Sequence, residues 1–330
     1  MTVDEFVSEW QNGHDRLLVK TSGSTGQPKQ LWVEKRRMEA SARITCDFLG
    51  LQPGDTALLC MSPDYIAGKM MIVRSLVRHL RLTVVEPSGH PLAAAHSSLP
   101  ERPFDFVAMV PMQVYNSLQV PAERERLMAV RHLIIGGGAV DGALAEQLRH
   151  FPHAVWSTYG MTETLSHIAL RRLSGPEASD WYTPFESVSV SLSADHCLVI
   201  DAPLVCATRL VTNDIAELSP DGCHFRIIGR KDNVVCSGGI KIHIEEVERL
   251  LRPHLPEPFA VSKRSDEKFG EALVLVSESA DTASLRSVCE RVLPKYWQPH
   301  HYVHANSIPL TETGKPARAL IACLAADNKK

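Results

Sequence analysis

Apolar and polar positions follow two different periods along the first half of this 330-residue chain. Short apolar runs that stop at Pro or Gly predict buried strands, and stretches with apolar positions three or four residues apart predict helices. Strands are expected at 17–19, 56–60, 82–86, 106–110, 132–135 and 154–157, and helices at 1–13, 33–49, 66–79, 112–118 and 141–148. This alternation indicates parallel βαβ units, so we expect an α/β fold that binds ligands at the carboxyl ends of its strands.

From about Ser187 the pattern changes to short alternating runs without helical stretches between them. The runs at 188–192, 197–200, 208–211, 215–218 and 224–228 predict a small antiparallel β subdomain over about 187–230. Beyond the charged segment Gly229–Asn233, helices are expected at 243–251, 282–293 and 317–324 and strands at 272–277 and 301–304. We therefore expect a large N-terminal body over 1–231 and a small, mobile α+β C-terminal lid domain over 232–330.

Composition and charge argue against several classes of partner. The chain has 35 basic and 38 acidic side chains, so its net charge of −3 gives no electrostatic reason to expect nucleic acid or an anionic membrane as main partner. No apolar run has the length of a membrane span, and the polar, acidic N-terminus does not predict a signal peptide. Eight scattered cysteines without a Cys-x-x-Cys pair indicate reduced thiols, a cytoplasmic location and no structural zinc.

The stretch with the clearest chemical signal directly follows the first predicted strand. It combines hydroxyls, glycines and one cation, and its candidate phosphate-binding residues are Thr21, Ser22, Gly23, Ser24, Thr25, Gly26 and Lys29. Glycines let a backbone approach a ligand closely, and backbone N–H groups in such a turn can bind phosphate oxygens. The spacing is not that of a Walker A motif, because Lys29 is not followed by Ser or Thr. An ordinary polar connection is the alternative at this point.

Three further residues indicate a functional site only when they are considered together with the other motifs. Glu163 follows the predicted strand at 154–157 and is either a solvated or helix-capping carboxylate or a magnesium ligand beside substrate phosphates. Asp214 is either a turn residue or an acceptor for ribose hydroxyls. Lys315, between Gly314 and Pro316, is an ordinary surface lysine if it is considered alone.

Together, these segments resemble the acyl-adenylate-forming enzymes, the superfamily of acyl-CoA ligases, peptide-synthetase adenylation domains and luciferase-like enzymes. The resemblance extends over the whole chain, and its motifs are Thr21–Lys29, Tyr159–Glu163, Asp214, Gly229–Asp232 and Gly314–Lys315. Because several motifs occur in the family's order, the resemblance is far more specific than any one of them. It implies ATP and coenzyme A as substrates and Mg²⁺ as cofactor.

The resemblance implies a nucleotide site built from five segments of the chain. The segment Thr21–Lys29 is similar to the family's phosphate loop over ATP, and Gly136, Gly137 and Gly138 resemble the glycine segment that lines the adenine and acyl pockets. Tyr159, followed by Gly160 and Met161, resembles the ring that stacks on adenine. Thr162 would contact the α-phosphate and Glu163 would bind Mg²⁺, while Asp214 and Arg230 would bind ribose.

The resemblance also implies a rotation between two reaction steps. Asp232 matches the hinge position, Gly238 and Gly239 match the turn that enters the site for thioester formation, and Lys315 matches the lysine that completes the adenylation site. A carboxylate substrate is already ionised at neutral pH, so its attack on the α-phosphate needs positioning and charge neutralisation rather than a general base. A rotation of the small domain would then allow the CoA thiol to enter the site.

The acid itself is suggested by weaker evidence. Residues 65–76, 110–113 and 229–239 resemble those of 2-succinylbenzoate–CoA ligases of menaquinone biosynthesis. Arg74 interrupts an otherwise apolar helix and is either a snorkelling side chain or a cation for the second carboxylate of a dicarboxylic acid. Ser166 and His167 would line the same pocket, although His167 could equally be a core histidine.

Three features depart from the family pattern. Only about twenty residues precede the phosphate loop, so the body is a shortened version and a partner subunit, in the simplest case a homodimer, stays an open alternative. Gln30 replaces a common Gly, and no Asn precedes Gly314. The rival functions are a ligase for another aryl or fatty acid and a catalytically silent nucleotide- or acyl-binding module.

Overall fold

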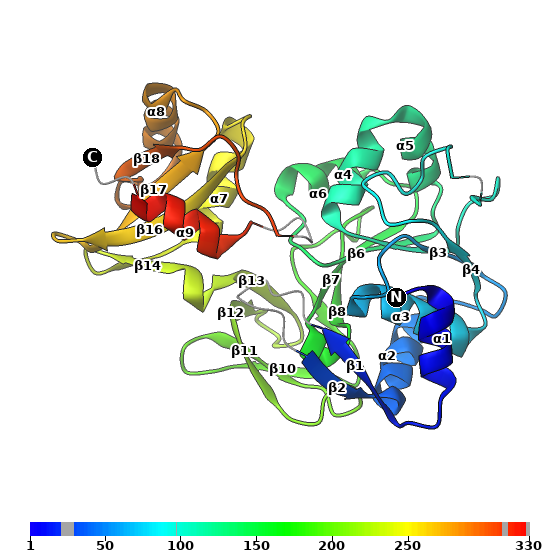
Figure 1. Ribbon diagram of the computed structural model, residues 1–330. Helices are drawn as coiled ribbons and strands as arrows, with labels where there is room; N and C mark the ends of the chain where they lie inside the picture. The colour runs from blue at the N-terminus through cyan, green and yellow to red at the C-terminus, as the bar shows by residue number, and fades with distance from the viewer. Residues whose placement is uncertain (21–29, 97, 312–315, 328–330) are drawn as a thin grey trace.

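The computed structural model describes residues 1–20, 30–96, 98–311 and 316–327. The expected phosphate loop at 21–29 and Lys315 lie outside the described residues. The chain forms a large body and a smaller C-terminal unit, which are connected through residues 231–233 (Figure 1). This arrangement confirms the expected α/β class: parallel strands form most of the main sheet of the body and one pair in the C-terminal sheet, and the remaining described strand pairs are antiparallel.

The body is built on a seven-stranded sheet with the order β4-β3-β5-β6-β7-β8-β9. Its strands are β3 (Thr56–Leu59), β4 (Arg81–Val84), β5 (Phe106–Met109), β6 (His132–Ile135), β7 (Ala154–Gly160), β8 (His167–Arg172) and β9 (Thr183–Pro184). The strands from β4 to β7 are parallel, as expected, whereas β8 and β9 are added antiparallel. The pattern did not predict β8, and its return beside β7 forms the corner that holds Glu163.

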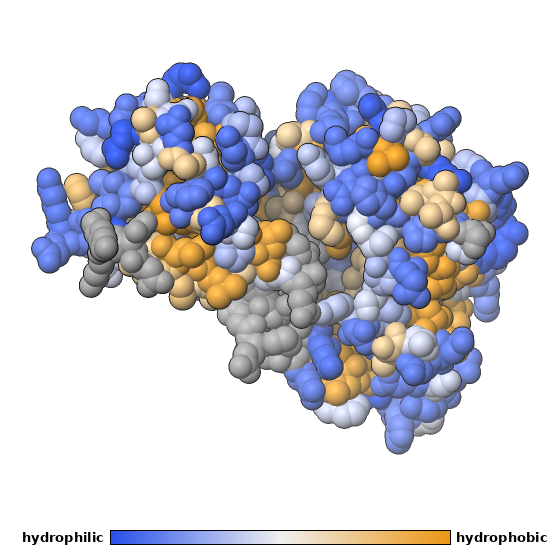
Figure 2. Space-filling model, turned by 45° about the horizontal axis from the view of Figure 1, so that its top comes forward, coloured by the Kyte–Doolittle hydropathy of each residue, from blue (hydrophilic) through white to orange (hydrophobic). Residues whose placement is uncertain are grey.

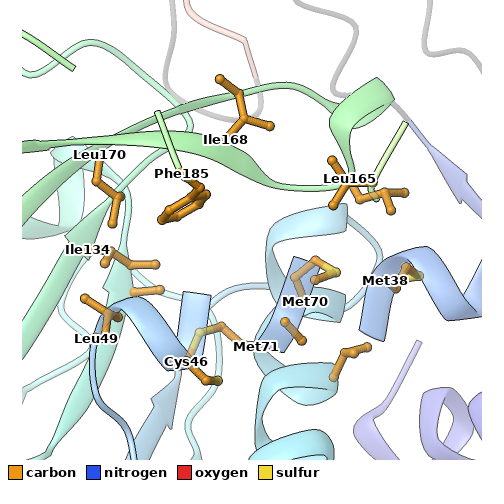
Figure 3. Packing of buried hydrophobic residues seen from close by; sticks show 14 of the residues in the cluster. Met38, Cys46, Leu49, Met70, Met71, Ile134, Leu165, Ile168, Leu170 and Phe185 are labelled. Carbon is orange, nitrogen blue, oxygen red and sulfur yellow. The ribbon is translucent and has the colours of Figure 1, made fainter. Parts of the chain in front are cut away.

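In the described part of the body, six helices cover the two faces of this sheet. They are α1 (Val3–Gln11), α2 (Lys35–Phe48), α3 (Ile66–Arg78), α4 (Pro111–Gln119), α5 (Pro121–Met128) and α6 (Gly142–Arg149). Side chains alternate across a strand, so Ala57 and Leu59 pack with α1–α3 while Leu58 packs with α4–α6. Figure 3 shows Met38 of α2 and Met70 of α3 in the first of these layers, together with Ile134 and Leu170. Burial on both faces explains why the central strands are continuous apolar runs.

A two-stranded hairpin lies beside the main sheet. It consists of β1 (Arg16–Lys20) and β2 (Gln30–Glu34), which pair in antiparallel fashion from Lys20–Gln30 to Arg16–Glu34. The helix expected from residue 33 therefore begins only at Lys35, because Val33 belongs to β2. Lys20 also forms a parallel bridge with Tyr65, which places the end of β1 next to the start of α3.

The antiparallel β subdomain follows with the order β10-β11-β12-β13. Its strands are β10 (Ser189–Leu192), β11 (Cys197–Asp201), β12 (Leu210–Leu218) and β13 (Phe225–Arg230). The two strands expected at 208–211 and 215–218 are one strand, β12, with a register shift between Ile215 and Ala216. The polar residues between the two apolar runs, which include Asp214, therefore lie within a strand and not in a turn.

The C-terminal unit consists of a further sheet packed between helices. Its elements are β14 (Val234–Ser237), β15 (Ile240–His243), α7 (Ile244–Leu251), β16 (Phe259–Asp266), β17 (Gly270–Ser277), α8 (Thr282–Val292), β18 (His301–His304) and α9 (Arg318–Asp327). β16 was not predicted, although it pairs with β17 over eight residues. A short 3₁₀ turn, Lys231–Asn233, joins this unit to β13. The boundary expected at Asp232 falls in that turn, and its role as a domain boundary stays a prediction.

The expectations about cysteines and membrane spans can be compared directly with the structure. All eight cysteines lie in the described part of the chain and are free thiols, as expected. No helix of the described segments has both the length and the apolar character needed to cross a membrane. Polar side chains cover much of the visible surface, which is hollowed where the body faces the C-terminal unit (Figure 2).

An ion pair between the half-buried Arg318 and the buried Glu248 links two helices of the C-terminal unit. Arg318 of α9 donates hydrogen bonds to both carboxylate oxygens of Glu248 on α7, at 2.7 and 2.8 Å, and to the carbonyl oxygen of Val261 on β16. Glu248 also accepts a hydrogen bond from the N–H of Val261. The arginine thereby connects the helices that lie on the two faces of the sheet.

We predict that Arg318→Met lowers the free energy of unfolding of the C-terminal unit by roughly 3 kcal/mol, because the carboxylate of Glu248 stays buried without its cation. Urea unfolding measures the change. Arg249→Met is the control, since Arg249 pairs with Glu246 on an exposed helix face and should cost below about 1 kcal/mol. Equal losses in both variants would contradict the prediction.

Candidate active site

The carboxyl ends of β6 and β7 form the floor of the candidate site. Gly136 follows β6 at a point where a Cβ atom would lie 2.5 Å from Oγ1 of Thr158, and Gly137 has a φ of +78°. At the end of β7, a Cβ atom on Gly160 would lie 2.2 Å from the carbonyl oxygen of Ser166. Larger side chains do not fit at these positions. The structure thus brings Gly136–Gly138 beside Tyr159–Glu163. Gly136 is required by the side chain of Thr158, and Gly160 by the backbone of Ser166.

The corner between β7 and β8 presents Glu163 to solvent. It is a 3₁₀ turn, Thr162–Thr164, in which Oγ1 of Thr164 accepts a hydrogen bond from the N–H of Met161 and donates to the carbonyl oxygen of Ser166. Leu165 completes the corner with a φ of +65°. Glu163 is exposed and forms no hydrogen bond or ion pair with another described residue. The turn is thus held by its neighbours, which leaves this carboxylate available.

The geometry of Glu163 fits a magnesium ion that is bound mainly by substrate. No group of three His, Cys, Asp or Glu side chains in the described segments could hold a metal ion by itself. Mg²⁺ commonly takes one or two carboxylates and completes its shell with phosphate oxygens and water. A single exposed carboxylate beside the expected nucleotide site would meet that requirement.

A hydrogen-bonded network joins the end of β7 to the β subdomain. The hydroxyl of Tyr159 donates to Oδ2 of Asp214 at 2.6 Å, and Nη1 of Arg230 donates to Oδ1 of the same carboxylate at 3.1 Å. Asp214 and Arg230 are paired residues on β12 and β13. Nη2 of Arg230 and the amide of Asn213 both donate to Oδ2 of Asp232. Residues expected to bind adenine and ribose and to act as the hinge therefore form one array.

The environment of Tyr159 keeps its hydroxyl protonated. Burial and the adjacent carboxylate of Asp214 raise the pKa of the tyrosine far above its ordinary value, because both disfavour a phenolate. Its ring lies edge-on against Phe225, with 5.1 Å between the ring centroids. Tyr159 is therefore a fixed donor to Asp214 at any physiological pH.

Arg74 lies in a second polar cluster, behind the corner that holds Glu163. Its side chain is 2% exposed, and Nη2 donates to Oγ of Ser166 at 2.6 Å. No carboxylate among the described residues pairs with it, and its buried Nε has no partner in that part of the chain. Burial lowers the pKa of Arg74 to about 10, so the guanidinium is still charged at neutral pH. The snorkelling arrangement considered from the sequence is wrong, because the charged end is buried.

His167 and Thr45 complete this cluster. Nε2 of His167 is 3.0 Å from Oγ1 of Thr45, and Nδ1 is 3.3 Å from Oγ of Ser166. Burial and the charge of Arg74 hold the pKa of His167 well below its usual value, so the imidazole is neutral. Both ring nitrogens have partners, as in a core histidine, and its substrate-binding role stays a prediction. Sequence patterns missed Thr45, since a threonine on a helix carries no signal of its own.

Gly238 and Gly239 form the tip of the hairpin between β14 and β15. Their φ angles are +55° and +85°, as a two-residue hairpin turn requires. The N–H of Gly238 donates to the carbonyl oxygen of Phe269, next to the β16–β17 turn, on the side of the C-terminal unit away from the body (Figure 1). In this conformation the glycine turn is therefore remote from Tyr159 and Asp214.

The family of the protein follows from a direct match. The sequence profile described as AMP-binding enzyme matches residues 8–203, more than half of the chain. The chain belongs to this family of AMP-binding enzymes.

Individual relatives agree with this assignment. The chain is 24% identical to a 2-succinylbenzoate–CoA ligase of Bacillus cereus, over 91% of this chain and 68% of that enzyme. It is similar to the crystal structure of an acyl-CoA synthetase (AMP-forming)/AMP-acid ligase II-like protein from Dyadobacter fermentans, with 35% identity, coverage of 96% and 91% of the two chains and a TM-score of 0.65. The fold also matches O-succinylbenzoate coenzyme A synthetase of Bacillus subtilis in complex with ATP and magnesium, with 22% identity, coverage of 92% and 68% and a TM-score of 0.77.

We predict that Tyr159→Phe weakens AMP binding about tenfold, because the ring is kept while the donor that fixes Asp214 is lost. Isothermal titration calorimetry measures the affinity. Tyr182→Phe is the matched control, since the hydroxyl of Tyr182 is bonded to Ser157 and its ring packs on the same Phe225. An unchanged affinity in Tyr159→Phe, or an equal loss in both variants, would show that the Asp214 contact does not orient the nucleotide site.

Proposed function

We propose that this protein is an ATP-dependent, AMP-forming acid–CoA ligase whose acid is 2-succinylbenzoate. In the first step a substrate carboxylate attacks the α-phosphate of ATP and diphosphate leaves. In the second step the thiol of coenzyme A attacks the acyl carbon of the adenylate, and AMP leaves. The relatives named above support the reaction class, and the surroundings of Arg74 support the choice of acid.

The buried guanidinium of Arg74 is the observation that carries the substrate proposal. An unpaired charge in the protein interior costs several kcal/mol, so a cation of this kind indicates an anionic partner. 2-Succinylbenzoate has two carboxylates: one reacts with ATP, and the other remains as a permanent anion. Arginine binds a carboxylate through two parallel N–H donors, and Ser166 is already within hydrogen-bond distance of the same guanidinium. A monocarboxylic aryl or fatty acid would leave this charge unmatched.

The residues of the candidate site have distinct tasks in the adenylation step. Asp214 and Arg230 would hold the ribose, while the ring of Tyr159 would lie against adenine. Thr162 would donate to the α-phosphate, and Glu163 would hold Mg²⁺, which neutralises phosphate charge when bound. The loop from Thr21 to Lys29 and Lys315 lie outside the described residues, so their phosphate contacts rest on the motif alone.

The thioester step requires another arrangement of the two units. The turn Gly238–Gly239 faces away from the body, and residues 231–233 form the covalent link between β13 and β14. A rotation about Asp232 would exchange the adenylation face of the C-terminal unit for this glycine turn. The ion pair between Arg230 and Asp232 would have to rearrange during that rotation.

We predict that ATP–diphosphate exchange depends on the acid supplied. Exchange should be fast with 2-succinylbenzoate and at least about tenfold slower with benzoate or a fatty acid, because neither has a second carboxylate for Arg74. Incorporation of labelled diphosphate into ATP measures the rate. Faster exchange with a fatty acid would replace the proposed substrate, and ATP binding without exchange on any acid would identify a silent binding module.

We further predict that Arg74→Met raises KM for 2-succinylbenzoate at least about tenfold and leaves KM for ATP unchanged. Removing a buried, unpaired cation should not lower the Tm, since a methionine of similar length fills the space. Arg78→Met, one helical turn further on, is the control, because Arg78 pairs with Asp47 and lies closer to solvent. A lower Tm with an unchanged KM would show that Arg74 acts only in the structure of the body.

A further inference from the structure

A series of side-chain hydrogen bonds connects Arg74 on α3 to the backbone of α2. Nη2 of Arg74 donates to Oγ of Ser166 at 2.6 Å, and this oxygen is 3.3 Å from Nδ1 of His167. Nε2 of the same imidazole is 3.0 Å from Oγ1 of Thr45, and that hydroxyl donates to the carbonyl oxygen of Ser41 at 3.1 Å. Nη2 of Arg74 also lies 3.5 Å from Oγ1 of Thr45, so the guanidinium contacts both ends of this series.

The hydroxyl of Thr45 sets the direction of these bonds. Its single proton is used in the bond to Ser41, so its oxygen accepts from Nε2 of His167. Burial and the charge of Arg74 lower the pKa of His167, and a neutral imidazole carries one N–H, which leaves Nδ1 as an acceptor. Ser166 therefore donates its proton to Nδ1 and accepts from Arg74. The opposite direction would leave the proton of Ser166 without an acceptor among the described residues.

The buried position of these groups keeps bulk water from replacing their partners. Thr45 is fully buried, Arg74 is 2% exposed and His167 is 7% exposed. The imidazole also packs against the ring of Phe185, with 5.6 Å between the ring centroids, which limits its rotation. A buried polar group that loses its partner is destabilised, so each member of the series holds the next in one orientation. The series therefore fixes the hydroxyl of Ser166, and with it the guanidinium of Arg74.

The polar side-chain atoms of Thr45 and His167 are all engaged within the series. Oγ1 of Thr45 and both ring nitrogens of His167 have the partners given above. The charge of Arg74, by contrast, has no carboxylate partner among the described residues. Thr45 and His167 can thus act on a bound anion only by orienting this guanidinium.

We propose that Thr45 and His167 are positioning residues for the acid substrate, which they affect only through the orientation of Arg74. The proposal rests on the proposed function, in which Arg74 binds the second carboxylate of a dicarboxylic acid. A guanidinium that is held in place before the substrate arrives loses less conformational freedom on binding, so its affinity for that carboxylate is higher. A monocarboxylic acid makes no use of Arg74 and gains nothing from this arrangement.

Substitutions at Thr45 test the proposal by ATP–diphosphate exchange with the full-length protein. Thr45→Val keeps the shape but removes the hydroxyl, and it should raise KM for 2-succinylbenzoate about tenfold, with KM for ATP and for benzoate changed less than about twofold. Thr45→Ser keeps the hydroxyl and should restore a KM near that of the wild type. Ser75→Ala is the matched control, because Ser75 is a buried helical hydroxyl that donates to the carbonyl oxygen of Met71, outside the series.

Two substitutions at His167 distinguish its two contacts. His167→Asn places an amide oxygen near the position of Nδ1 and keeps an acceptor for Ser166, whereas His167→Gln keeps a donor near Nε2 for Thr45 and loses that acceptor. KM for 2-succinylbenzoate should therefore rise more in His167→Gln than in His167→Asn. These variants also carry the test if Thr45→Val fails to fold. In ¹⁵N NMR spectra of the wild type, the resonances that His167→Gln removes should show a protonated Nε2 and an unprotonated Nδ1.

Several results would contradict the positioning role. An unchanged KM for 2-succinylbenzoate in Thr45→Val would overturn it, as would an equal rise in KM for benzoate, an equal effect of Ser75→Ala, or a protonated Nδ1 in His167. If the wild type shows no exchange with 2-succinylbenzoate, the proposed function fails and the positioning role falls with it. Normal exchange in the wild type combined with an unchanged KM in the variants would overturn the positioning role alone.

Discussion

The carboxylate of Asp214 is the acceptor on which the arrangement of the candidate site depends. It holds the hydroxyl of Tyr159 from the body sheet and the guanidinium of Arg230 from the neighbouring strand. Arg230 in turn donates to Asp232 in the turn that leads to the C-terminal unit. The lone pairs of a carboxylate lie in the plane of the group, so its donors can approach only from a few directions. These contacts therefore fix the positions of three separate segments relative to one another. Any movement at the junction must therefore act on the same network that would hold the nucleotide.

Arg74 differs from the other arginines because its charged group is buried among neutral partners. Many of the other arginines keep contact with solvent and have a carboxylate partner, as Arg226 has in Glu217. Arg74 instead has Ser166 and Thr45, neutral groups that satisfy hydrogen bonds but not charge. The cost of such an arrangement is consistent with a site that receives its anion from a substrate.

Much of the fold could be predicted from periodicity, and the failures have local causes. The central strands were predicted well because burial on both faces makes them continuous apolar runs. β2 was missed because it runs directly into α2 without a turn residue between them. β16 was missed because its second half is polar, and β12 was divided in two because Asn213 and Asp214 resemble a turn. In each case, pairing with a neighbouring strand decided the structure against the local pattern.

The sequence by itself determined the class of the fold, the family and the types of residue that the chemistry would require, since these depend on short motifs and on local periodicity. Only the tertiary structure decided which of these residues meet: that Tyr159 and Arg230 share Asp214, and that Gly238 and Gly239 face away from the body. It also decided that Arg74 is buried without a carboxylate among the described residues. Contacts between residues far apart in the chain and the loss of solvent around a charge arise only when the sheets pack, and no local pattern encodes them.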